Sequence, residues 1–108
     1  MRIDFILFTE QCATLLGREI HVREALSNNG LNFDRHFTSF SEFVITLVSV
    51  NWRISGGRLM LTGTERTSYE IGADQLISFL RLGAAEYELT EKCGPSVFRK
   101  TTLEVLSL

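Results

Sequence analysis

The chain has 108 residues, of which 44% are hydrophobic and 22% are charged, and its formal net charge is −2. This slightly acidic balance argues against a nucleic-acid-binding domain, and apolar residues along the whole length argue against disorder. Cys12 and Cys93 are too few for a disulfide framework, and no apolar run reaches the ~20 residues of a membrane helix. We therefore expect a soluble, cytoplasmic chain with free thiols that does not enter a membrane.

The first residues alternate between two sides, and residues 2–8 are therefore predicted to form a strand. Thr9 can cap a following helix, which the spacing of apolar residues extends to the stop signal at Gly30. The alternative is a shorter helix that ends near Gly17, followed by a strand through Ile20 and Val22.

A loop over residues 31–38 comes next, and the spacing of apolar residues predicts a helix over 40–49. Ser39 and Glu42 have the spacing of a capping box, which supports that helix. The same segment is rich in β-branched residues such as Val44 and Ile45, which favour a strand.

Two short apolar runs flank Gly56 and Gly57, which is the pattern of a hairpin. A third short strand is predicted over 69–71. Asp74 can then open a helix that continues through Leu80 and ends at Gly83.

Alternation predicts strands over 86–90 and 97–106, with a turn at residues 92–96 between them. The predicted order is β-α-α-β-β-β-α-β-β. We therefore expect one α+β domain over residues 1–108, with about three helices and a mixed or antiparallel sheet of about five to six strands.

The residues capable of chemistry are scattered. His21 and His36 have no second histidine at ligand spacing, so the sequence predicts no metal site and no cofactor. His36 could act as a general base oriented by Asp34, because a carboxylate is a usual partner of such a base. A histidine on a surface loop is the simpler interpretation, and no catalytic residue is assigned. Cys12 is expected to be buried and inert.

Four phenylalanines lie within eleven residues, and this is the most unusual local feature of the chain. Large aromatic side chains each bury roughly 150–250 Å². The group can be a core plug beneath a loop, the lining of an apolar pocket, or a subunit interface. The candidate ligand-binding or interface residues are Phe33, His36, Phe37, Phe40 and Phe43.

Apolar residues also occupy sides of the two terminal segments that strand alternation would leave exposed. A sheet that is apolar on both faces must be covered on both, and a second copy is the economical cover. The candidate dimer contacts are Ile6, Phe8, Leu106 and Leu108.

The favoured hypothesis is a non-catalytic, homodimeric binding or interaction module that takes a small apolar ligand or a protein partner. The alternative is a small enzyme in which His36 and Asp34 form an acid–base site, with Tyr69 or Tyr87 as a further candidate. A nucleic-acid-binding accessory role is the least favoured because the chain is acidic.

Overall fold

The computed structural model describes residues 2–53 and 57–106. This described part holds one α-helix, three short 3₁₀ helices and seven strands. In chain order they are α1 (Arg2–Cys12), η1 (Ala13–Leu15), β1 (Glu19–Ser27), β2 (Thr38–Arg53), β3 (Arg58–Gly63), η2 (Thr64–Arg66), β4 (Ser68–Gly72), η3 (Ala73–Gln75), β5 (Leu76–Gly83), β6 (Glu86–Lys92) and β7 (Phe98–Val105).

The predicted α+β fold with about three helices is wrong, because the chain is mainly a seven-stranded antiparallel sheet. The strand predicted over 2–8 is the helix α1. Phe8 and Cys12, four residues apart, are both buried on the face of α1 that enters the core. A spacing of four residues is helical, but the predicted strand ended at residue 8, so Phe8 and Cys12 were assigned to different elements.

The helix predicted after Thr9 is also wrong. The chain makes only the short turn η1 and then enters β1, as the alternative interpretation proposed. Gly17 separates the two, with a φ of +86° that a side chain would disfavour, and its N–H donates to the Leu47 carbonyl. Ile20 and Val22 then alternate with more exposed neighbours, as in a strand with one buried face.

The helix predicted over 40–49 is replaced by β2, a strand of 16 residues. Phe40 and Val44 are exposed on one face, while Ile45 and Leu47 are buried on the other. The strand preference of the β-branched residues therefore prevailed in this segment. The apolar residues have a helical spacing because the strand carries apolar side chains on both faces.

The third predicted helix, from Asp74, is the turn η3 followed by β5. Leu76 lies opposite Glu91 and Phe79 lies opposite Leu89, so both point to the same face although they are three residues apart. A β-bulge between Leu76 and Ser78 produces this spacing. In the sequence, this spacing of apolar residues resembles that of a helix.

The other strand predictions agree with the structure. The hairpin arms predicted around the two glycines pair as β2 and β3, with Trp52 opposite Leu59. The strand predicted over 69–71 is β4, and those predicted over 86–90 and 97–106 are β6 and β7. Residues 54–56 of the hairpin turn lie outside the described part of the chain.

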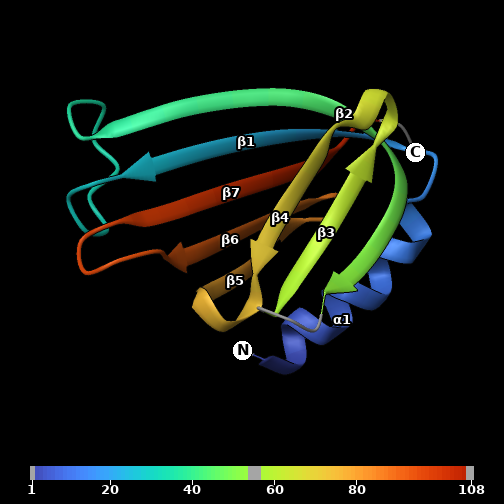
Figure 1. Cartoon of the computed structure of the whole chain (residues 1–108), viewed down its shortest axis with the longest axis horizontal. Helices are drawn as coiled ribbons and strands as arrows, with labels where there is room; N and C mark the ends of the chain where they lie inside the picture. The colour runs from blue at the N-terminus through green and yellow to red at the C-terminus, as the bar shows by residue number, and fades with distance from the viewer. Residues whose placement is uncertain (1, 54–56, 107–108) are drawn as a thin grey trace.

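The strand order is β4-β3-β2-β1-β7-β6-β5. The first half of β2 pairs with β1 and the second half with β3, with a bulge between Leu47 and Ser49. Figure 1 shows β2 curving strongly, so that β3 and β4 cross in front of β1, β7 and β6, while α1 lies at one end. The sheet therefore has an inner face, which is folded on itself, and an outer face.

The hydrophobic core occupies the inner face. Phe8 of α1 packs against Phe79 and Tyr87, with ring centroids 5.2 and 5.0 Å away. The buried core side chains come from α1 and from β1, β2, β3, β4, β6 and β7: Phe8, Cys12, Ile20, Val22, Ile45, Leu47, Leu59, Leu61, Tyr69, Ile71, Tyr87, Leu89 and Leu103. α1 thus covers one end of the inner face, where it completes the core.

Candidate functional site

The four phenylalanines of the predicted site do not form one cluster. Phe43 points to the inner face, where its ring centroid lies 5.9 Å from that of Tyr69. Phe40 points to the outer face and is 63% exposed. Phe37 is exposed, and Phe33 lies below the Lys100 ammonium, 4.6 Å from the ring centroid. The series therefore serves the core, the outer face and a loop.

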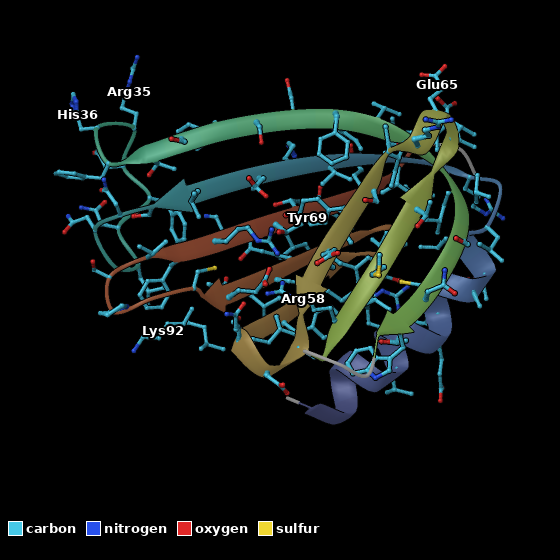
Figure 2. The ribbon with its side chains drawn as sticks, in the orientation of Figure 1. Arg35, His36, Arg58, Glu65, Tyr69 and Lys92 are labelled. Atoms are coloured by element: carbon cyan, nitrogen blue, oxygen red, sulfur yellow. The ribbon has the colours of Figure 1, made fainter. Side chains whose placement is uncertain are left out.

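His36 and Asp34 do not form an oriented acid–base pair. The Asp34 carboxylate accepts the backbone N–H of His36 at 2.9 Å, which is a local turn contact. His36 is exposed and points away from the body of the protein, whereas Tyr69 lies in its middle (Figure 2). The Tyr87 hydroxyl donates to Gln11 of α1 at 3.0 Å.

The prediction of dimer contacts at Ile6 and Phe8 rested on a strand over residues 2–8, and these residues are helical. Phe8 is 1% exposed and packs inside its own chain, so it presents no surface to a second copy. Leu106 is exposed. The side chain of Ile6 and the whole of Leu108 lie outside the described residues.

The two cysteines differ in environment, and both are free thiols. Cys12 is buried in the core, as predicted, and burial raises its pKa to about 12. Cys93 is exposed, and partial burial, followed by the nearby Glu91 carboxylate, raises the pKa of its thiol. A thiolate is disfavoured at both positions.

Five polar side chains on the inner face form a connected cluster, which we call the inner clamp: Glu24, Tyr69, Glu91, Arg99 and Thr101. The Glu91 side chain is fully buried, and its Oε1 accepts from Arg99 Nη2 at 2.7 Å and from Nε at 3.0 Å. Arg99 also lies 3.4 Å from the Glu24 carboxylate. The Tyr69 hydroxyl donates to Glu24 at 3.0 Å and lies 2.5 Å from the Thr101 hydroxyl.

The inner clamp also holds the backbone of β4. Arg99 donates to the Glu70 carbonyl at 2.6 Å, and the Gly72 N–H donates to Glu91 at 3.0 Å. β4 is an edge strand, so these two groups have no neighbouring strand to bond. The clamp therefore fastens β4 to β6 and β7 across the fold.

A cavity of about 360 Å³ opens beside the inner clamp, and Arg58 and Cys93 contribute to its lining. In the described part of the chain, no buried side-chain polar atom lacks a hydrogen-bond partner. Burial, more than any other cause, raises the pKa of Tyr69 above its ordinary range, so its phenol keeps its proton. We therefore assign the clamp a structural role, because its groups are already bonded to one another.

A larger hollow, of about 630 Å³, lies on the outer face of the sheet, and we call it the outer groove. Its floor contains the short side chains Ala25 and Thr102, which lie on the neighbouring strands β1 and β7. Its sides contain Phe40 of β2 and Leu82 of β5. Both are large apolar residues, and their exposed fractions are 63% for Phe40 and 49% for Leu82.

Charged side chains also line the outer groove. Arg23 donates to Glu86 at 3.2 Å, and Glu42 lies 3.0 Å from His21. Glu88 lies opposite Thr102 on the floor, and it has no ion-pair partner among residues 2–53 and 57–106. Exposed apolar sides around a charged floor are typical of a surface that binds another molecule.

Two kinds of feature are absent from the described residues, a metal-binding cluster and a membrane-spanning helix. No group of three or more His, Cys, Asp or Glu side chains there could hold a metal ion. Within the same ranges, none of the helices has the length and apolar character needed to cross a membrane.

Sequence reasoning found Phe40 but missed the rest of the outer groove. The missed residues include Arg23 and Ala25 of β1, and Leu82 and Glu88 of the β5–β6 hairpin, which lies far from β1 in the sequence. The only available signal was the alternation within each strand, and it cannot say which strands are neighbours.

Comparison of the chain with protein-family models, with curated proteins and with solved structures found no match.

Proposed function

We propose that this chain is a non-catalytic interaction module and that it binds a protein partner in the outer groove. The observation that carries the proposal is the exposure of Phe40 and Leu82 on either side of a floor in which the short side chains Ala25 and Thr102 lie among charged ones. Antiparallel sheets commonly leave one face in water, but that face then usually carries polar side chains. Large apolar residues beside a hollow favour binding of a partner.

A protein partner fits this groove better than the other classes of ligand. A small apolar ligand would leave the carboxylates of Glu42 and Glu88 facing it, and a phosphate backbone would be repelled by them. Catalysis is disfavoured because the buried titratable groups of the inner clamp already bond one another. A cytoplasmic location belongs to the same proposal, since both cysteines are free thiols.

Selection of peptides from a random display library tests the proposal. Library members would be selected on the immobilised protein and then measured against the double variant Phe40→Thr/Leu82→Thr. Threonine keeps a high strand propensity, so the fold should persist. We expect the selected peptides to bind the double variant at least about tenfold more weakly, since loss of the few apolar side chains that anchor a partner costs more than about 1 kcal/mol each.

The matched control is Leu31→Thr, which changes an exposed leucine that does not line the groove. It should leave peptide affinity unchanged. Peptides that bind Phe40→Thr/Leu82→Thr as tightly as the native chain would refute the outer groove as the binding site.

Self-association through the same face is a separate outcome of this test. Light scattering of the native chain and of Phe40→Thr/Leu82→Thr at micromolar concentration measures it directly. A dimer that the double variant abolishes would identify a second copy as the partner.

A further inference from the structure

We propose that the outer groove receives a basic amphipathic helix from another protein. This inference rests on the proposed function and adds the shape and the charge of the partner. It follows from the width of the groove, from the side chains that line it and from the balance of charge on its floor.

The width of the outer groove suits a helix. Its two apolar sides lie on β2 and β5, which are separated by β1, β7 and β6 in the sheet. Four inter-strand spacings of about 4.8 Å give a width of about 19 Å. An α-helix with its side chains is about 10–12 Å across, so one helix fits between β2 and β5. The cross-strand row of Phe40 meets β5 at Ser78, four residues before Leu82, so a helix that contacts both apolar side chains crosses the strands obliquely.

The floor permits close approach. Ala25 lies opposite Phe40 on one side and Lys100 on the other, and Thr102 lies opposite Arg23 and Glu88. Ala25 and Thr102 are short, so a helix can approach the sheet most closely at these two positions, between the longer side chains of Arg23 and Lys100. The apolar stripe of that helix would then contact Phe40 and Leu82, which now face water.

The charge of the lining selects a basic partner. Glu24 turns its carboxylate to the inner clamp, and Arg23 is paired with Glu86 at 3.2 Å. Lys100 lies over the Phe33 ring. The carboxylates of Glu42 and Glu88 remain toward the groove. Among the described residues, Glu42 lies 3.0 Å from His21, and Glu88 has no ion-pair partner. Lysine or arginine side chains on the partner would neutralise them.

A second copy of this chain is a poor occupant of the same groove. A symmetric contact would place one acidic lining against another, and like charges that face each other are destabilising. Nor does the copy offer a free helix. α1 is the one α-helix of the described residues, and its Phe8 and Cys12 side chains are buried in its own core.

The experiment uses three synthetic helical peptides of about 14 residues with the same leucine stripe. Their polar positions carry lysine, glutamine or glutamate. Affinity is measured by fluorescence anisotropy against the native chain and its variants. We expect the lysine peptide to bind at least about tenfold more tightly than the glutamate peptide, with the difference shrinking as salt is added.

Two single substitutions locate the charge effect. Glu88→Gln should weaken the lysine peptide by about two- to fivefold, the range of one partly exposed ion pair, and should leave the glutamine peptide unchanged. Glu65→Gln is the matched control. Glu65 is exposed on the β3–β4 connection and points away from the body of the protein (Figure 2), so it should have no effect.

The outcomes separate this inference from the proposed function. If the glutamine and lysine peptides bind equally, and Phe40→Thr/Leu82→Thr weakens both, the charge inference is overturned while the interaction site stands. If the lysine peptide binds that double variant as tightly as it binds the native chain, or fails to bind at all, the helix inference is overturned. Equally tight binding of the lysine peptide to the double variant and to the native chain would also refute the groove as the binding site.

Discussion

The two faces of the same sheet use charged residues in opposite ways. On the inner face, Arg99 is enclosed by the carboxylates of Glu24 and Glu91, and the fully buried Glu91 also accepts a backbone N–H from β4. On the outer face, the charged side chains are partly exposed, and Glu88 has no ion-pair partner within the described residues. A closed network holds a fold together, whereas an open one leaves charge available to a partner.

Position along a single strand decides which use a cation has. Arg99 and Lys100 are consecutive residues of β7, so they point to opposite faces. Arg99 bonds β4 and β6, while Lys100 lines the outer groove. Substitution of Arg99 or of Lys100 therefore tests the difference between the two faces at neighbouring positions of one strand.

The largest effect is expected from Arg99→Met, which keeps a long side chain but removes the charge. It leaves the Glu91 carboxylate buried without its cation, and loss of one partner from a buried pair costs about 3–5 kcal/mol. Lys100→Met should change the free energy of unfolding by no more than about 0.5 kcal/mol. Urea denaturation measures both, and equal losses would contradict the division between the two faces.

A second comparison contrasts two phenylalanines. Phe8→Ala removes a ring that is 1% exposed and contacts two other rings, so a loss of about 3–5 kcal/mol is expected. Phe40→Ala removes an exposed ring and should cost about 1 kcal/mol or less, mainly through lower strand propensity. Thermal or urea unfolding of the two variants decides this. A loss above about 3 kcal/mol for Phe40→Ala would mean that the ring belongs to the core.

The smallest effect concerns the reactivity of the thiols. Cys93 is exposed, so iodoacetamide should alkylate it at pH 8, although slowly because its raised pKa leaves little thiolate, whereas buried Cys12 should remain unmodified in the folded chain. Mass spectrometry after protease digestion identifies the modified residue. Modification of Cys12 at the rate of Cys93 would contradict its burial against the inner face.

The pKa of Cys12 also predicts a dependence of stability on pH. Burial raises this pKa from 9.0 to about 12, so the folded chain holds the thiol proton more tightly than the unfolded chain does. The contribution of Cys12 is complete below pH 9 and is lost as the pH rises toward 12. The free energy of unfolding of the native chain should therefore fall over that interval. The free energy of unfolding of Cys12→Ala should fall less steeply.

The sequence predicted the second half of the fold better than the first. β3, β4, β6 and β7 each combine alternation with a clear turn, and in each the local pattern and the tertiary structure agree. β2 and β5 carry apolar residues on both faces or contain a bulge, so their spacing resembled that of a helix. α1 was missed because its core-facing residues Phe8 and Cys12 lie on either side of the predicted end of the strand over 2–8.

The outer groove could not have been assembled from the sequence. Its residues come from β1, β2, β5, β6 and β7, and they meet only because β7, the last strand of the chain, lies between β1 and β6. Phe40 was identified because of its aromatic neighbours. Those neighbours then proved to lie elsewhere, because Phe43 faces inward and Phe33 and Phe37 belong to the loop before β2.

The most direct test of the outer groove is nuclear magnetic resonance of the ¹⁵N-labelled chain titrated with the lysine-bearing peptide. We predict that the amide signals that move most belong to Ala25, Phe40, Leu82, Glu88 and Thr102, and that those of Leu31 and Glu65 stay in place. Movement confined to the loop at 28–37 or to the β3–β4 connection would contradict the assignment of the outer face as the binding surface.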